Sequence, residues 1–443
     1  MLVKNKSLIK NSGWNILGVA IPSLIAIPAM GFMARLLGLE IFGLFTLAYA
    51  IVGYASIFDG GLSRAVIRAI AKDSACLGKA QKIIGTAGWT VLILGLLATV
   101  ILWFSSPALS KLLNVSAENM SDTIKAFRWL SFSIPPLLLS SIWLSYLEGK
   151  ERFSELNIIK IFSSSLLIVL PLFFVLGKPI LSFAILGMVL GRYLTMFFAL
   201  FVCIKNLKGN IWRFDKNTLV ELFRFGSWIT LSNLISPLMV YFDRFILANL
   251  VGAQKVAFYS APAEAVSRLL IVPAAVSRAL FPRLSRQSED AQAQAKKSFW
   301  VLFLVCVSIA APTFIFTEEL MTLWMGVEYS GDSAKALKIL LIGFIFNSIA
   351  QIPFSQIQAA GHSKVTALVH LCELGPYILL LYFLISEFSV LGAAMAWTLR
   401  VAIDFFIILI VKKRIDHVKT PPRVDSSRGS PIKSAQAARP VLK

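Results

Sequence analysis

The sequence has little charge. Only 15% of its 443 residues are charged, 57% are hydrophobic, and the mean hydropathy is +0.76. A soluble globular protein carries about 25% charged residues, so this chain has too little polar material to cover the surface of a soluble enzyme. The same composition excludes a disordered protein and a disulfide scaffold, and it indicates an all-α integral membrane protein.

Cysteine, histidine and catalytic motifs are scarce as well. The four cysteines, Cys76, Cys203, Cys306 and Cys372, form no CxxC pair and no metal spacing, and the three histidines do not cluster with them. We therefore expect the cysteines to act as small apolar residues, and we predict no metal site and no cofactor. The sequence has no Walker lysine loop, GxSxG or HExxH motif, which argues against an ATPase or a hydrolytic enzyme.

The sequence is rich in long apolar runs. A lipid-facing backbone must satisfy its own hydrogen bonds, so each run is expected to be a helix of about 20 residues that crosses about 30 Å. The basic tail over 412–443 is expected to be disordered. The predicted spans are 13–34, 41–61, 83–105, 126–147, 157–177, 180–204, 222–242, 256–281, 298–317, 336–359, 364–386 and 390–411.

The net charge of +20 comes from 43 Lys and Arg against 23 Asp and Glu. Such an excess suggests nucleic acid in a soluble protein, but the cytoplasmic loops of membrane proteins also collect Lys and Arg. If both termini lie in the cytoplasm, the predicted spans place most basic residues on the cytoplasmic side, which supports this topology. We therefore expect no nucleic-acid partner. The basic residues left in outer segments are Arg35, Lys111, Lys125, Arg128, Lys178, Lys255, Lys335 and Lys338.

The two halves of the chain resemble each other at a separation of 214 residues. Because six spans separate equivalent positions, the halves are expected to be parallel repeats related by an axis along the membrane normal. This predicts one six-helix bundle over 1–213, another over 214–411, and a substrate site between them that opens alternately to either side. The matches include Trp14 with Trp228, Gly38 with Gly252, and Ser63-Arg64-Ala65 with Ser277-Arg278-Ala279.

Short motifs in three places resemble a known family. The segment Arg35–Phe45 contains an LGxxxFG turn, Asp243–Tyr259 repeats this pattern loosely, and Gln356–Gly361 ends the tenth predicted span. Their order and spacing are similar to the polysaccharide-transport family of the MOP exporters, and to the Wzx-type flippases of O-antigen, capsule and exopolysaccharide within it. The second half departs from the first where Ala257 stands in the place of Gly43.

The resemblance implies a MATE-like fold of about twelve transmembrane helices in two pseudo-symmetric six-helix bundles. It implies a transporter rather than an enzyme: a flippase that moves undecaprenyl-diphosphate-linked oligosaccharide from the cytoplasmic to the periplasmic leaflet of the bacterial inner membrane. This step would serve lipopolysaccharide or exopolysaccharide biosynthesis. The implied partners are the lipid-linked oligosaccharide, the bilayer, and a polysaccharide polymerase and chain-length regulator. We expect a monomer, because one chain contains both bundles.

A diphosphate inside a membrane needs cations, and arginine suits it because its planar fork donates two hydrogen bonds together. Arg268 and Glu264, one turn apart in a predicted span, are the first candidates for substrate binding, with a neutral structural pair as the alternative. Arg64 and Arg278 are either an anion clamp at the cytoplasmic mouth or ordinary cytoplasmic anchors. The remaining candidates are Arg35, Arg244 (expected at the outer end of the seventh span) and Arg400.

Coupling to H⁺ or Na⁺ would require a carboxylate within the membrane. Glu373 is the first candidate because it has no obvious local partner, and a lone buried carboxylate can carry a proton. Asp59 and Asp404 are further candidates. Each lies close to an arginine in the sequence, Arg64 and Arg400 respectively, so a structural ion pair is the alternative for both.

Two other classes of function remain open. An ion-coupled multidrug exporter of the same superfamily would place acids and few cations in its spans, whereas Arg192, Arg268 and Arg400 all fall within predicted spans here. An integral polysaccharide polymerase or ligase would need a catalytic outer loop, and the predicted outer connections are short.

Overall fold

The computed structural model describes residues 2–72, 77–207, 213–284 and 289–419, and every regular element in these ranges is helical. The elements are α1 (Leu2–Ala55), η1 (Ser56–Asp59), α2 (Leu62–Lys72), α3 (Leu77–Leu112), α4 (Ala117–Ser131), α5 (Ile134–Gly149), α6 (Phe153–Gly177), α7 (Leu181–Leu207), α8 (Lys216–Val251), α9 (Ala253–Leu269), α10 (Ile271–Leu284), α11 (Glu289–Ile315), α12 (Thr317–Met325), η2 (Val327–Tyr329), α13 (Asp332–Ala359) and α14 (Ser363–Lys419).

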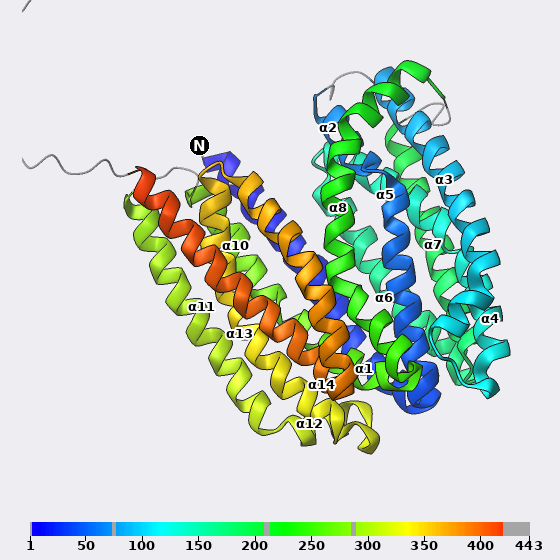
Figure 1. Ribbon diagram of the computed structural model, residues 1–443. Helices are drawn as coiled ribbons and strands as arrows, with labels where there is room; N and C mark the ends of the chain where they lie inside the picture. The colour runs from blue at the N-terminus through cyan, green and yellow to red at the C-terminus, as the bar shows by residue number, and fades with distance from the viewer. Residues whose placement is uncertain (1, 73–76, 208–212, 285–288, 420–443) are drawn as a thin grey trace, which may run out of the picture.

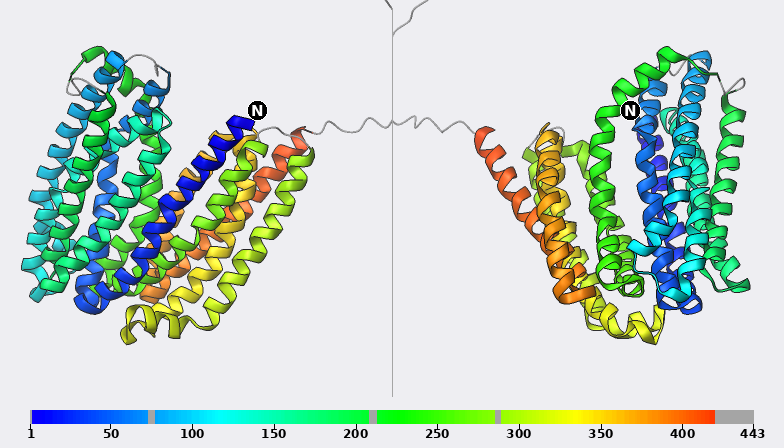
Figure 2. Two further views of the ribbon diagram at one scale, coloured as in Figure 1. Left: turned by 180° about the vertical axis from the view of Figure 1, so that it is seen from behind. Right: turned by 45° about the vertical axis from the view of Figure 1, so that its right-hand side comes forward.

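The helices form two lobes that meet at one end and diverge toward the other (Figures 1 and 2). Helices α2–α7 form the N lobe, α10–α14 form the C lobe, and α1, α8 and α9 lie between them. Helices α4 and α12 lie at the joined end, whereas α2 and α10 lie on opposite lobes at the diverging end. This arrangement confirms the predicted all-helical membrane fold.

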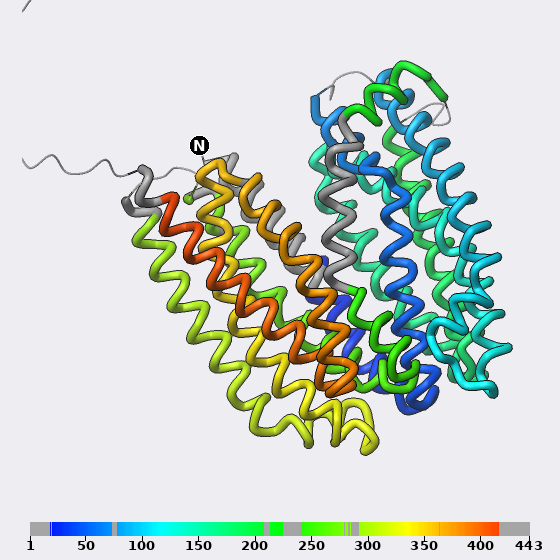
Figure 3. Tube along the Cα trace, in the orientation of Figure 1, coloured from blue at the N-terminus to red at the C-terminus, as the bar shows by residue number. Residues whose placement is uncertain are grey.

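Two of the long helices are each two spans joined by a tight reversal. The break in α1 is at Gly38, with φ 71°, and the break in α14 is at Ser389, with φ 53°. Glycine adopts a positive φ readily, whereas serine does so only rarely. In Figure 3, α14 runs toward the joined end and then returns beside itself. The described residues contain eight helices able to cross a membrane; the separate halves of α1 and α14, with α8 and the α9–α10 pair, raise these to the predicted twelve.

The expected span over 256–281 is interrupted. Helix α9 ends at Leu269 and α10 begins at Ile271. The break lies just before Pro273, whose ring removes one backbone donor and clashes with the carbonyl group of the residue four positions earlier, Leu269. The helix therefore divides next to the proline, which removes one of its backbone hydrogen bonds.

The placement of Asp243 and Arg244 at the outer end of a span is wrong. Helix α8 continues to Val251, and both residues lie within it, only 3% and 5% exposed. The apolar segment Phe245–Val251 prolongs the helix until Gly252, where φ is 93°. The charged pair is therefore buried in the protein, and its charges must be satisfied there.

Two further expectations concern the tail and the cysteines. Helix α14 runs to Lys419, so the beginning of the tail expected to be disordered over 412–443 is helical, and 420–443 lies outside the described residues. Cys203, Cys306 and Cys372 are free thiols, and Cys76 lies outside the described residues.

The internal repeat is visible in the contacts. Thr46 Oγ1 donates to Ser260 Oγ at 3.1 Å, and these residues are 214 positions apart. Residues related by a two-fold operation touch each other only where they lie at its axis, so α1 and α9 cross at the pseudo-symmetry axis. The repeat also relates two serine pairs, each 78 positions apart: Ser63 with Ser141 at 3.0 Å, and Ser277 with Ser355 at 2.6 Å. The side chains of Trp14 and Trp228 lie outside the described part.

Gly43 permits the close approach at this axis. A Cβ atom there would lie 2.2 Å from the carbonyl oxygen of Ala253, which no side chain tolerates. The equivalent residue Ala257 is buried in the same contact. Small residues let transmembrane backbones approach closely, so one glycine in the pair is enough.

The distribution of the core explains why the lobes meet at only one end. One buried cluster contains residues of both halves, including Phe42, Phe127, Tyr259 and Phe344. A second cluster is confined to the first half and the beginning of α8, where it includes Leu222. The halves therefore share a core at the joined end and pack separately toward the diverging end.

Candidate functional site

A cavity of about 450 Å³ lies between the two halves of the chain, against α1; we call it the central cavity. Helices α5, α6 and α7 of the first half and α8 and α9 of the second half complete its wall. Its charged and hydroxyl-bearing lining residues are Thr46, Tyr49, Ser56, Arg192, Tyr241, Arg244, Glu264 and Arg268.

Glu264 forms ion pairs with two arginines in the wall of the central cavity. Its carboxylate lies 3.0 Å from Arg244 Nη2 and 3.6 Å from Arg268 Nη2. Arg268 also donates to Ser23 Oγ at 3.4 Å. The i,i+4 pairing of Glu264 with Arg268 expected from the sequence is present, and it lies in a cavity rather than against lipid.

Arg244 is the most enclosed member of this group, with its side chain 7% exposed. The backbone amide of Arg244 donates to Asp243 Oδ1 at 2.7 Å, and the Tyr259 hydroxyl donates to Asp243 Oδ2. Both Asp243 and Glu264 thus lie beside Arg244, which gives its charge a structural role in joining α8 to α9.

Arg192 is a cavity residue that the sequence left without a role. It projects from α7, and its buried Nε atom has no hydrogen-bond partner. No carboxylate in the described ranges forms an ion pair with it. Its position in a predicted span was visible, but its neighbours come from distant helices, so only the tertiary structure shows that it faces Glu264 and Arg268 across one cavity.

The cavity therefore has three guanidinium groups and one carboxylate, a net positive lining. An uncompensated buried cation is costly, and intramembrane charges of this kind mark substrate or ion pathways. The remaining wall is mostly apolar and aromatic, including Met30, Met33, Phe45 and Ile168. Such a lining suits an amphiphilic anion whose charged group meets the arginines.

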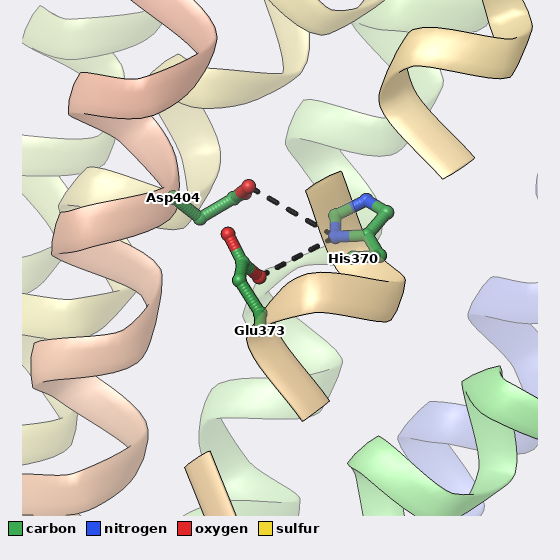
Figure 4. A group of neighbouring side chains, drawn as sticks. All are labelled: His370, Glu373 and Asp404. Atoms are coloured by element: carbon green, nitrogen blue, oxygen red, sulfur yellow. Dashed lines mark ion pairs between the residues drawn. The ribbon is translucent and has the colours of Figure 1, made fainter. Parts of the chain in front are cut away.

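A second charged cluster joins the two halves of α14 (Figure 4). His370 Nδ1 lies 3.6 Å from Glu373 Oε2 and 3.9 Å from Asp404 Oδ1. Arg400 Nε lies 4.0 Å from the same Glu373 oxygen, and its guanidinium carbon lies 5.0 Å from the Tyr377 ring centroid.

The expectation that Glu373 is a lone carboxylate is wrong. His370 lies one turn before it, and Arg400 reaches it from the returning half of the helix, which local spacing does not reveal. Potential ligand atoms of His370, Glu373 and Asp404 lie within 4.8 Å of one another. Because Arg400 already supplies a positive charge beside Glu373, the cluster suits a proton or a monovalent cation better than a divalent metal.

The other sequence candidates lie apart from these clusters. Arg35, at the joined end, donates to the carbonyl oxygens of Thr322, at 3.4 Å, and Leu323. Arg64 on α2 and Arg278 on α10 are exposed on opposite lobes at the diverging end, so the structure does not bring them together as a clamp (Figure 1).

Asp59 has a local partner. The backbone amide and the hydroxyl group of Ser63 donate to its carboxylate at 3.2 Å and 3.0 Å. This is the arrangement of a side chain that caps the beginning of a helix, here α2. The geometry gives Asp59 a structural role.

Comparison with known proteins identifies the family. Residues 8–288 match the family described as polysaccharide biosynthesis protein, and residues 229–384 match the MatE family. A putative O-antigen transporter from Shigella flexneri is 43% identical over 400 residues, which cover 90% of this chain and 96% of that protein.

Solved structures show the same fold. An inward-facing multidrug resistance MATE family transporter of the MOP superfamily aligns with a TM-score of 0.72 and 17% identity, over 91% of this chain and 95% of the other. An outward-facing transporter of that description gives 0.65 and 20%, over 94% and 97%.

These likenesses agree with the helical architecture. The match over 8–288 spans more than half of the chain, and the Shigella protein aligns along nearly all of it. The chain therefore belongs to the polysaccharide biosynthesis protein family, and it is a multi-pass membrane transporter with the MATE fold.

Proposed function

We propose that this protein is a flippase for undecaprenyl-diphosphate-linked oligosaccharide repeat units. It would move them from the cytoplasmic to the periplasmic leaflet of a bacterial inner membrane by alternating access, as a monomer. The polymerase and the chain-length regulator of the pathway would act on the translocated units. The Shigella relative, named as a putative O-antigen transporter, supports this class of substrate.

The observation that carries the proposal is the unpaired charge of Arg192 in the central cavity. A diphosphate supplies the missing anion, and planar guanidinium groups bind phosphate oxygens through paired hydrogen bonds. Arg192 comes from the first half and Arg268 from the second. A diphosphate held by both would therefore respond to the relative movement of the lobes.

The same lining disfavours export of cationic drugs. Three arginines against one glutamate repel a cationic ligand in a medium of low dielectric constant.

The basic residues of α2 and α10, including Arg64, Arg68 and Arg278, lie at the diverging end. The preference of basic residues for the cytoplasmic side supports a cytoplasmic location for this end, with both termini inside and the cavity facing inward.

The test uses a strain that lacks this protein but makes the oligosaccharide. A membrane-impermeant reagent that modifies sugars is applied from the periplasmic side, and the modified fraction of lipid-linked units is measured. The proposal expects intact units to stay protected in the deletion strain and to become accessible when the wild-type protein is restored. Equal accessibility in both strains would show that this chain does not translocate them.

We further propose that the cluster of His370, Glu373 and Asp404 couples transport to H⁺ or Na⁺. The three groups are partly shielded from solvent, lie on both halves of α14, and can exchange a cation when these halves move. Asp59 is a weaker candidate because its carboxylate already caps α2.

Replacing Glu373 by glutamine should uncouple transport from the ion gradient, because the amide keeps the shape and cannot ionise. In proteoliposomes, proton or sodium movement on addition of the lipid-linked oligosaccharide should be lost. Glu387→Gln, an exposed position on the same helix, is the matched control and should behave as wild type. Unchanged ion movement in Glu373→Gln would remove the cluster from the coupling mechanism.

A further inference from the structure

A second large cavity, of about 480 Å³, lies within the C lobe; we call it the C-lobe cavity. It is bounded by α10, α13 and α14, and it is separate from the central cavity, with which it shares no lining residue. Eight of its twelve lining residues are polar or charged, which is unusual for a space between transmembrane helices. His370 and Asp404 form one side of it.

The polar lining comes chiefly from one face of α13. Asn347, Gln351, Ser355 and Gln358 recur at helical spacing and all border the cavity. The hydroxyl groups of Ser355 and Ser277 share a hydrogen bond, and Gln358 Nε2 donates to Thr366 Oγ1 at 3.5 Å. In the part of the chain that the structure describes, the side-chain amides of Asn347 and Gln351 hydrogen-bond to no protein group, although both face the cavity.

The first half of the chain provides an internal comparison. The repeat that pairs Ser141 with Ser355 places Leu137 and Leu144 of α5 at the positions of Gln351 and Gln358. The packing faces of the two helices agree: Leu138 and Trp143 are buried in α5, as are Ile352 and Ile357 in α13. The fold is therefore built equally well with leucine at these positions.

The amides of Gln351 and Gln358 are thus not required for packing, and the amides of Asn347 and Gln351 are accessible from the cavity, since neither is a buried group without a partner. Polar groups within a membrane need partners, and those without a protein partner favour a polar ligand. Each amide offers both donors and an acceptor, which match hydroxyl and acetamido groups. Phe354, whose ring centroid lies 5.5 Å from that of His370, adds an apolar ring surface beside them.

We propose that the C-lobe cavity binds the carbohydrate part of the substrate through the amide groups of Asn347, Gln351 and Gln358. This inference rests on the proposed function. It divides recognition between two sites: the arginines of the central cavity take the diphosphate, and the amides of α13 take uncharged sugar groups.

The test replaces two glutamines of the second half by leucine, the residue that stands at the equivalent positions of the first half. Gln351→Leu and Gln358→Leu are combined in the full-length protein, and binding of two probes is measured in nanodiscs. One probe is the lipid-linked oligosaccharide extracted from the deletion strain, and the other is undecaprenyl diphosphate without sugar. Gln356→Leu is the control, since this residue lies on α13 and borders neither cavity.

The double variant should bind the lipid-linked oligosaccharide about 10- to 100-fold more weakly, as expected for two lost hydrogen-bonding groups. Its affinity for undecaprenyl diphosphate should not change, and Gln356→Leu should bind both probes as wild type does. Equal affinity of the double variant and the wild type for the oligosaccharide would overturn the carbohydrate site. If the wild type binds neither probe, the proposed function itself fails.

Discussion

Replacing Arg192 by leucine is expected to abolish surface polysaccharide export without destabilising the protein. The Nε atom of Arg192 is buried, and in the described ranges no carboxylate is paired with its side chain. Removing a buried charge that lacks a partner relieves a desolvation cost, so the apparent Tm in detergent should stay the same or rise. Affinity for undecaprenyl diphosphate should fall at least about 100-fold, since charge-assisted hydrogen bonds contribute roughly 1.5–3 kcal/mol each.

Two further variants separate this role from a structural one. Arg192→Lys keeps the charge but loses the planar fork, so it should retain part of the affinity. Arg244→Leu should instead unfold readily, because it removes the buried guanidinium group that is paired with Glu264, at a cost of about 3–5 kcal/mol. If Arg192→Leu is as unstable as Arg244→Leu, then Arg192 holds the fold together and the anion site is elsewhere.

Loss of the contacts of Arg35 and Asn249 is expected to open the joined end of the molecule. These two residues are equivalent in the repeat, and each reaches across to the other half of the chain. Arg35 donates to carbonyl oxygens of α12, and Asn249 Nδ2 donates to the carbonyl oxygen of Leu112 at 2.8 Å. The contacts exist only when this end is closed, so removing both shifts the population toward the opposite opening.

The shift can be measured by thiol labelling in cells. Cysteine replaces Ser56 in the central cavity of a protein whose native cysteines are removed, and an impermeant maleimide is added from the periplasmic side. Arg35→Ala with Asn249→Ala should label about 10-fold faster, which corresponds to a change of about 1.4 kcal/mol. Arg128→Ala is the control, because this arginine lies over Trp103 within the same lobe. An unchanged labelling rate in the double variant would show that these contacts do not keep the joined end closed.

The sequence predicted most of the fold because a membrane imposes a local rule. Each span must satisfy its own backbone hydrogen bonds, so apolar runs identify helices without knowledge of their neighbours. The internal repeat could also be recognised in the sequence, and the contact between Thr46 and Ser260 agrees with the 214-residue separation of equivalent positions. Two span boundaries were predicted wrongly. One expected span is interrupted beside Pro273, and α8 continues past Arg244, where a span was expected to end.

The sites were less predictable. Glu264 and Arg268 were paired from their spacing, because residues four apart on one helix are neighbours. Arg192 had no such neighbour, and the importance of its missing partner appears only because α7 and α9 line the same cavity. Glu373 was expected to be alone, yet Arg400 approaches it from the second half of α14.

The sequence by itself thus determined that the chain crosses a membrane as helices and that it consists of two related halves. Both properties follow from hydrophobicity and repetition along one dimension. The tertiary structure decided which charges meet, because interhelical distances depend on packing, as at Gly43 where only a hydrogen atom fits against Ala253. It also showed that the two halves use equivalent helices differently, with Leu137 beside the central cavity and the equivalent Gln351 beside the C-lobe cavity.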